Sequence, residues 1–178
     1  MKKFEEQTLH SDTFFQGNIL NIRVDQVKLP DGNTSSREIV EHAGGVTILP
    51  VTKKDEIIMV KQFRKPAEQV LLELPAGTLE VDEIPAKCAQ RELIEETGYK
   101  TDNIKKLFSF YTSPGYSDEL LHLFAGKVYK YQDQNLDEGE FVEVVLIDKS
   151  NIMDLIAANK IKDGKTIMGL LYYLQNGI

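Results

Sequence analysis

Residues 77–98 read GTLEVDEIPAKCAQRELIEETG, and this segment is the most informative one for the fold. Pro85 suits the first turn of a helix, where a missing N–H is tolerated. Gly98 suits the left-handed residue that ends a helix. No helix breaker lies between these two residues. We therefore predict a helix over residues 85–97.

This predicted helix gathers three carboxylates on one face. At about 100° per residue, Glu96 lies about 40° to one side of Glu92 and Glu95 about 60° to the other. Like charges at these spacings destabilise a helix unless a cation neutralises them. Mg²⁺ prefers oxygen ligands and is commonly held by carboxylates together with substrate phosphates. The alternative is a solvent-facing acidic surface, the usual environment of glutamate pairs.

The spacing of the fixed residues favours the magnesium interpretation. The stretch fits the pattern Gly77-x5-Glu83-x7-Arg91-Glu92-Leu93-x-Glu95-Glu96-x-Gly98. It matches every fixed position of the Nudix box, and Tyr99 is the one departure, since the family prefers an aliphatic residue there. The chain thus resembles the Nudix hydrolases, which cleave a nucleoside diphosphate linked to another group.

The resemblance implies a metal site. Glu92 and Glu96 are expected to ligate Mg²⁺, and Glu95 is expected to be a ligand or a close neighbour of one. The backbone carbonyl of Ala76 is expected to complete the site. Two or three Mg²⁺ ions are expected, and Mn²⁺ could replace them.

Three other box residues are expected to shape the site. Gly77 would permit a tight loop before the helix. Arg91 would orient the neighbouring carboxylates through its planar guanidinium group. Glu83 is expected to be structural.

A downstream segment narrows the substrate. Residues 111–119 read YTSPGYSDE, with Pro114 sixteen residues beyond Gly98. This segment resembles the proline motif of ADP-ribose pyrophosphatases. Ser113, Gly115 and Glu119 are therefore candidate substrate contacts, through hydroxyl, backbone and carboxylate groups. From these residues alone, a plain surface turn is an equal alternative.

The likeness to bacterial ADP-ribose pyrophosphatases also includes residues 36–41, SREIVE, and 61–64, KQFR. Arg37 and Arg64 are candidates to bind phosphate or to stack on a base, and Glu41 could accept from an adenine amino group. Each of them alone would more often be a solvated charge. The aromatic residue that stacks on adenine is left open among three candidates, Phe14, Phe15 and Tyr116.

The acidic loop Asp137-Glu138-Gly139-Glu140 is similar to a loop that carries catalytic acids in this subfamily. The resemblance assigns Glu138 as the general base and Glu140 as a metal contact. A register slip of two residues would exchange the two roles. Without the resemblance, the loop is simply solvent-facing.

The resulting hypothesis is direct attack of water on the diphosphate of ADP-ribose, giving AMP and ribose 5-phosphate. The scattered histidines and Cys88 offer no Ser/His/Asp or Cys/His set for a covalent route. One alternative is hydrolysis of another NDP-sugar or of a dinucleotide. Another is a non-catalytic nucleotide sensor, although such a module need not keep every box carboxylate.

Composition limits the partners. The formal net charge of −7 disfavours nucleic acid and anionic membrane surfaces. The single cysteine, Cys88, has no intramolecular disulfide partner, and neither a signal peptide nor a membrane-spanning apolar run is visible. We therefore expect a cytoplasmic protein.

Strand and helix patterns predict a mixed α/β fold of the α+β kind. Residues 1–43 are expected to form a small antiparallel β subdomain for dimerisation and substrate contacts, and residues 44–178 a Nudix α/β/α sandwich with a mixed sheet. Further strands are predicted at residues 45–51, 56–63, 107–112, 120–131 and 141–147, and helices near 149–158 and 164–175. The family resemblance suggests a homodimer.

Overall fold

The computed structural model describes residues 3–178, and its contacts divide the chain into two compact units. The first unit runs to Gly44 and also contains the segment Tyr111–Leu120. The second contains Gly45–Phe110 and Leu121–Ile178. Each unit is described on its own.

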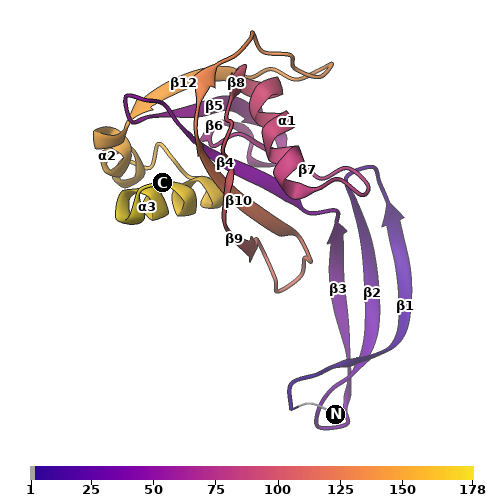
Figure 1. Cartoon of the computed structure of the whole chain (residues 1–178). Helices are drawn as coiled ribbons and strands as arrows, with labels where there is room; N and C mark the ends of the chain where they lie inside the picture. Colours follow the sequence, from indigo (N-terminus) through magenta and orange to yellow (C-terminus); the bar gives the residue numbers. More distant parts are fainter. Residues whose placement is uncertain (1–2) are drawn as a thin grey trace. The chain divides into compact units, whose positions relative to one another are not determined.

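The first unit is an antiparallel sheet in the order β1-β2-β3. Its strands are β1 (Gln7–Gln16), β2 (Leu20–Lys28) and β3 (Thr34–His42), drawn in indigo and violet in Figure 1. Gly32, with φ of +93°, closes the β2–β3 hairpin. Strand β1 was not predicted, and every one of its residues is exposed.

The proline segment packs on this sheet. The Val40 N–H donates to the Tyr116 carbonyl over 2.8 Å, and the Asp118 N–H donates to the Val40 carbonyl over 3.2 Å. The Asp118 side chain accepts from the His42 N–H at 2.8 Å. Residues far apart in sequence therefore share one unit.

The second unit is built on a larger sheet with the order β12-β5-β4-β10-β9, in which β6 pairs with β5 and β7 pairs with β4. Strands β4 and β10 pair in parallel. The pairs β12–β5, β4–β5, β5–β6 and β4–β7 are antiparallel, so the sheet is mixed. The strands are β4 (Gly45–Val51), β5 (Glu56–Arg64), β6 (Gln69–Glu73), β7 (Ala76–Thr78), β9 (Lys105–Tyr111), β10 (Leu120–Lys127) and β12 (Glu143–Asp148). A separate ladder joins β8 (Tyr99–Lys100) to β11 (Tyr129–Lys130).

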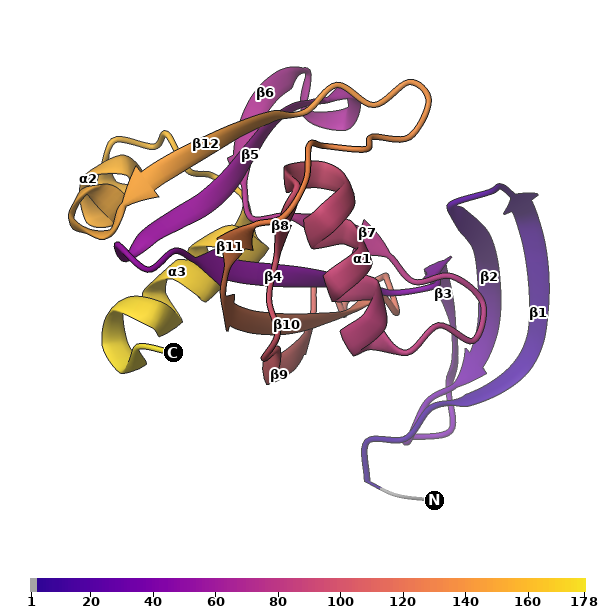
Figure 2. The same cartoon turned by 45° about the horizontal axis from the view of Figure 1, so that its top comes forward.

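Helices cover both faces of this sheet (Figure 2). On one face, α1 (Pro85–Thr97) packs through Ala89 and Leu93 onto a core that includes Ile48. On the other face, α2 (Ile152–Ala157) and α3 (Gly164–Asn176) pack on a core that includes Leu49. Because successive residues of a strand point to opposite faces, β4 supplies both cores. The predicted layered mixed α/β fold is confirmed.

The predicted helices are also confirmed, with small differences at their ends. Helix α1 begins at Pro85 and ends at Gly98, whose φ is +69° and whose N–H donates to the Ile94 carbonyl. The first C-terminal helix is shorter than expected, because residues 149–151 form a 3₁₀ turn, η2. A second 3₁₀ turn, η1, spans Lys65–Ala67. Among residues 3–178, no helix is both long and apolar enough to cross a membrane.

Candidate active site

Helix α1 carries the carboxylates of the candidate site. Its apolar residues Ala89 and Leu93 are fully buried against the sheet, which fixes the rotation of the helix. Glu96 is drawn inward and is 5% exposed, and its Oε2 accepts from the Ala76 N–H at 3.1 Å. The structure thus brings together Glu96 and Ala76, two of the residues expected at the metal.

Arg91 organises the other carboxylates of the helix. Its Nε and Nη2 donate to the two carboxylate oxygens of Glu83, both at 3.0 Å. Its Nη1 donates to Glu92 at 2.8 Å and to Glu95 at 3.0 Å. Bonding to Arg91 lowers the pKa of Glu83 to about 2. These contacts agree with the orienting role expected for Arg91 and the structural role expected for Glu83.

Gly77 has a different purpose from the one predicted. It lies in strand β7, not in a tight loop, and is not among the glycines with positive φ. A Cβ at this position would lie 1.9 Å from Oε1 of Glu92. The predicted loop role is therefore wrong, and the glycine is required because the Glu92 carboxylate occupies the space beside it.

Burial outweighs the nearby positive charge at Glu92 and Glu96. Burial raises the pKa of Glu92 to about 7 and that of Glu96 to about 8, and the negative charge of Glu140 adds to both shifts. Within residues 3–178, no group of three or more Asp, Glu, His or Cys side chains is placed to hold a metal ion. An open set of carboxylate and carbonyl oxygens suits Mg²⁺, which keeps waters and shares phosphate ligands.

The acidic loop is folded into a turn. The Glu140 N–H donates to the Asp137 carbonyl at 3.1 Å, and the Glu140 side chain accepts from the Asp137 N–H at 3.3 Å. Gly139, with φ of +88°, supplies the left-handed residue that such a turn requires. Glu138 precedes it and is exposed. The loop therefore brings the charge of Glu140 to bear on the α1 carboxylates while Glu138 faces solvent.

Gln134 fastens this loop to helix α1, and sequence reasoning missed it. Its side-chain amide donates to the Glu96 carbonyl at 2.6 Å and to the Val142 carbonyl at 3.2 Å. The Asn135 N–H donates to the Glu95 carbonyl at 2.9 Å. The segment before the acidic loop is thus tied to the end of the carboxylate helix, and Gln134 also links it to the segment after the loop.

Arg64 is held by a buried acid that was also missed. Its Nε and Nη2 donate to the two oxygens of Glu73 at 2.8 and 3.0 Å. Lys165 donates to the same carboxylate at 2.5 Å. The negative charge of Glu96 contributes to the raised pKa of Arg64, so the guanidinium group lies within electrostatic reach of the carboxylate helix. A charge at the end of the hydrophobic run VLLE was the available signal for Glu73.

Arg37 and Glu41 lie in the first unit, where other charges engage them. Arg37 donates to Glu6 at 2.9 and 2.6 Å. Glu41 lies 2.7 Å from Nε of Arg23, which in turn pairs with the buried Asp25. The structure therefore does not bring Arg37 and Glu41 together, and each has a local partner.

The proline segment forms a compact turn in the same unit. The Ser113 carbonyl accepts from the N–H groups of Tyr116 and Ser117 at 3.1 and 2.9 Å. Glu119 accepts from the Thr112 hydroxyl at 2.5 Å, and His42 lies 3.8 Å from it. Gly115 has open space beside its α-carbon. Ser113 and Gly115 thus lie within one turn, and Glu119 follows it.

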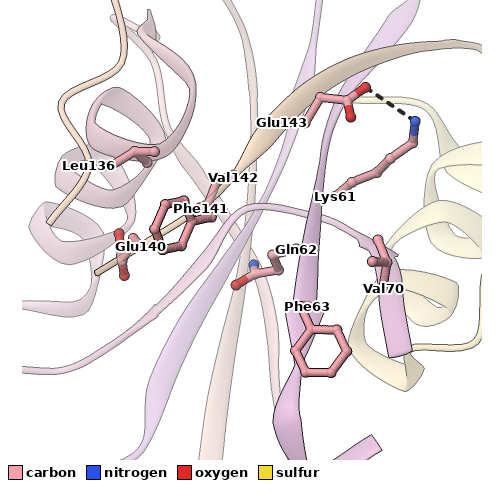
Figure 3. A pocket seen from close by; sticks show the side chains of 9 residues that line it. All are labelled: Lys61, Gln62, Phe63, Val70, Leu136, Glu140, Phe141, Val142 and Glu143. Carbon is pink, nitrogen blue, oxygen red and sulfur yellow. Dashed lines mark hydrogen bonds and ion pairs between the residues drawn. The ribbon is translucent and has the colours of Figure 1, made fainter. Parts of the chain in front are cut away.

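A pocket of about 530 Å³ opens beside the acidic loop (Figure 3). Its apolar lining comes from Phe63 and Val70 on β5 and β6 and from Phe141 after the loop, and Glu140 borders it. An ion pair of 3.2 Å between Lys61 and Glu143 stands at another side. The remaining lining residues are Gln62, Leu136 and Val142.

Comparison with known protein families matches two regions of the chain. Residues 41–168 match the NUDIX domain, and residues 6–40 match the nucleoside diphosphate sugar hydrolase N-terminal domain. The chain belongs to the Nudix family. The resemblance drawn from the carboxylate helix is confirmed, and the protein is a Nudix hydrolase.

Curated relatives of this Nudix hydrolase carry more than one name. The ADP-ribose pyrophosphatase of Bacillus subtilis (strain 168) is 43% identical over 97% of this chain and 94% of its own length. The methanol dehydrogenase activator of Bacillus methanolicus is 42% identical over 96% and 94%. A GDP-mannose pyrophosphatase of Yersinia enterocolitica is 38% identical over 80% and 79%. Two of these three names denote a pyrophosphatase that acts on a nucleoside diphosphate derivative, ADP-ribose or GDP-mannose.

Proposed function

We propose that this Nudix hydrolase cleaves the diphosphate of ADP-ribose to AMP and ribose 5-phosphate in a magnesium-dependent reaction. The main support is the oxygen-ligand set of the Glu92 and Glu96 carboxylates and the Ala76 carbonyl, in which burial raises the pKa of both carboxylates. The 43% identity to the B. subtilis ADP-ribose pyrophosphatase, over 97% of this chain, favours this substrate.

The metal is proposed to bind between helix α1 and strand β7. Glu92, Glu96 and the Ala76 carbonyl would hold it, with Glu95 as a further ligand or close neighbour and Glu140 as a further metal contact. Bound Mg²⁺ would neutralise the diphosphate and the charge that develops on it. Two or three ions, replaceable by Mn²⁺, are proposed because the carboxylates outnumber the ligands that one ion takes from protein.

The chain's own residues would then direct water to phosphorus. Glu138, exposed in its turn, accepts a proton from the attacking water. The new P–O bond forms as the bond from that phosphorus to the bridging oxygen breaks. AMP and ribose 5-phosphate are the two products. Arg64 stabilises the diphosphate charge.

The remaining predicted contacts are assigned to the nucleoside and the terminal ribose. Arg37 would bind phosphate or stack on the base, and Glu41 would accept from the adenine amino group. Ser113, the Gly115 backbone and Glu119 would bind ribose hydroxyls. Because Arg37 and Glu41 have local ion partners, substrate binding would have to replace those contacts.

A second candidate substrate is an NDP-sugar such as GDP-mannose. The Yersinia relatives and the match of residues 6–40 to the NDP-sugar hydrolase N-terminal domain favour it. The catalytic groups would be the same, because the diphosphate is common to both substrates. The difference would lie in the contacts to base and sugar.

The proposed active form is a cytoplasmic homodimer. Strand β1 is an edge strand whose residues are all exposed, and Leu9, Phe14 and Phe15 on it are 53%, 72% and 53% exposed. An unpaired edge with large apolar side chains is a surface that a second copy of the chain can cover. The lone thiol of Cys88 is buried and unpaired, which suits a reducing compartment.

The substrate proposal is tested with purified protein, Mg²⁺ and a panel of ADP-ribose, GDP-mannose and NAD. Chromatography should detect AMP from ADP-ribose with the highest kcat/KM of the panel. Glu96→Gln is the inactive control, and EDTA should abolish turnover. If GDP-mannose is hydrolysed and ADP-ribose is not, the second candidate replaces the first.

A further inference from the structure

We propose that Glu73 and Lys165 are positioning residues that hold Arg64 ready to bind the diphosphate of the substrate. The proposal rests on the proposed function only in taking a diphosphate as the group that is bound. It does not depend on which nucleoside or sugar is attached.

Glu73 is the centre of this arrangement. It ends strand β6 and is 1% exposed, so solvent cannot stabilise its charge. Burial acts to raise its pKa, but the bonds to Arg64 and Lys165 outweigh burial and lower it, which keeps the carboxylate ionised. Its two oxygens accept from two nitrogens of Arg64 at 2.8 and 3.0 Å. A bidentate pair of this kind fixes the plane of the guanidinium group.

Lys165 connects the pair to helix α3. Its Nζ lies 2.5 Å from Oε2 of Glu73 and 3.0 Å from Asp163, which accepts from the Thr166 N–H and caps the helix. The Thr166 hydroxyl accepts from the Leu74 N–H at 2.8 Å. The first turn of α3 is therefore fastened to the residue that follows Glu73.

Charge matching in this network leaves one group free for a ligand. Asp163 offsets Lys165, and Glu73 offsets Arg64. In the described part of the chain, the third guanidinium nitrogen of Arg64, Nη1, has no hydrogen-bond partner, and 39% of the side chain is exposed. The guanidinium group also lies within electrostatic reach of Glu96 on the carboxylate helix. A fixed arginine with a free N–H pair near that helix is preorganised for a phosphate oxygen, because little side-chain freedom remains to be lost.

A purely structural network would also bury these charges to dock α3 on the sheet. The two roles differ in one respect. A positioning role acts through Arg64 and disappears when Arg64 is removed, whereas a docking role persists. A double-mutant cycle distinguishes them.

The cycle uses the full-length protein with Glu73→Gln, Arg64→Met and the double variant. Glu73→Gln should raise KM roughly tenfold and change kcat less than about threefold, as expected for loss of one charge-assisted orienting contact. In the Arg64→Met background, Glu73→Gln should raise KM no further. Glu68→Gln, which removes an exposed partner of Lys65, is the matched charge control and should leave KM unchanged.

Binding of α,β-methylene-ADP by calorimetry gives a readout without turnover, and its Kd should follow the same pattern. Lys165→Met is a milder variant that keeps the Glu73–Arg64 pair, and it should raise KM by about two- to fivefold only when Arg64 is present. Equal effects in both backgrounds would overturn the positioning role. The cycle is run with both ADP-ribose and GDP-mannose. If the wild type does not hydrolyse ADP-ribose, the proposed substrate is contradicted, and the positioning role is still tested with GDP-mannose.

Discussion

Glu92 and Glu96 oppose the folded state when they carry charge, and the metal should reverse that effect. Their ordinary pKa is 4.5, and in the fold it rises to about 7 and about 8 because of burial. A raised carboxyl pKa contributes stability that is fully present below pH 4.5 and is lost as the pH rises through 7 and 8. The metal-free protein should therefore lose stability over this range.

Glu96→Gln tests this effect. Without metal at pH 8.5 or above (about half a unit beyond the folded pKa), the variant should be more stable than wild type by on the order of a few kcal/mol. The difference should vanish near pH 4.5. Thermal melting across pH measures it, and Mg²⁺ should raise the Tm of wild type but not of the variant. A variant less stable than wild type at high pH would contradict the assignment of burial as the cause.

Glu138→Gln tests the assignment of the general base. We expect kcat to fall by about 10²–10⁴ with an unchanged fold, since general-base catalysis contributes that much. Glu140→Gln should instead weaken the dependence on Mg²⁺ concentration. Steady-state kinetics at several Mg²⁺ concentrations separate the two. Exchange of the two phenotypes would exchange the two roles.

Gly77→Ala tests the space beside Glu92. The added Cβ would meet the Glu92 carboxylate at 1.9 Å, so the carboxylate must shift. A displacement of about 1 Å in a catalytic group can lower kcat/KM by about a hundredfold. Gly164→Ala is the control, because nothing lies within 4 Å of its added Cβ and helix α3 accepts alanine there. Normal activity in Gly77→Ala would remove this explanation of the glycine.

The limits of prediction at this scale follow from distance in sequence. The carboxylate cluster was predictable because helical geometry alone relates Glu92, Glu95 and Glu96. The partner of Arg64 was not, because the contact between Arg64 and Glu73 depends on the pairing of β5 with β6, in which Arg64 lies opposite Gln69. Lys165 is farther still along the chain, and no local pattern points to it.

Among the elements, the acidic loop follows a segment that the Gln134 side chain and the Asn135 N–H fasten to helix α1. Gln134→Glu keeps the shape of the side chain but removes both N–H donors and brings a charge toward two carbonyls. We expect kcat to fall by about tenfold or more while Mg²⁺ still binds, because the loop acids lose their position. Gln132→Glu adds the same charge in the same segment and should leave kcat near wild type. Equal kinetics in the two variants would show that the loop does not need this anchor.

Helix α1 and most strands were predictable because their signals are local. Pro85 and Gly98 mark the helix ends, and β-branched runs mark β4 and β5. Strand β1 was missed because its sequence QTLHSDTFFQ does not alternate cleanly and buries no face. Short β7 was missed because three residues carry no periodicity, although it holds Ala76 and Gly77.

At the scale of the whole molecule, the sequence did not predict that the proline segment belongs to the first unit. Residues 111–120 join the first unit through hydrogen bonds to Val40 and His42, which lie 76 to 78 positions earlier than their partners. Their composition indicates only a turn. Family resemblance supplied the functional suggestion, but only the fold placed the segment beside β3.

The proposed homodimer gives a prediction for the whole molecule. Phe14→Glu places a charge at a 72% exposed position of edge strand β1 and should weaken self-association by about thirtyfold or more. Val81→Glu also replaces an exposed apolar residue with glutamate, at a 93% exposed position of the second unit, and should leave the dimer intact. Light scattering over a concentration series measures the mass. A wild-type protein that is monomeric throughout would exclude the dimer.

Gly98 ends helix α1, but that is not all it does. Its carbonyl accepts from the N–H groups of Tyr131 and Gln132, and a Cβ on it would lie 2.2 Å from the Gln132 carbonyl. The last glycine of a short motif is thus fixed by a chain segment more than thirty residues downstream. Grafting the box onto an unrelated helix would copy its sequence without the neighbouring segment, residues 131–132, that makes this glycine necessary. Part of a sequence motif that looks local is therefore required by a tertiary contact.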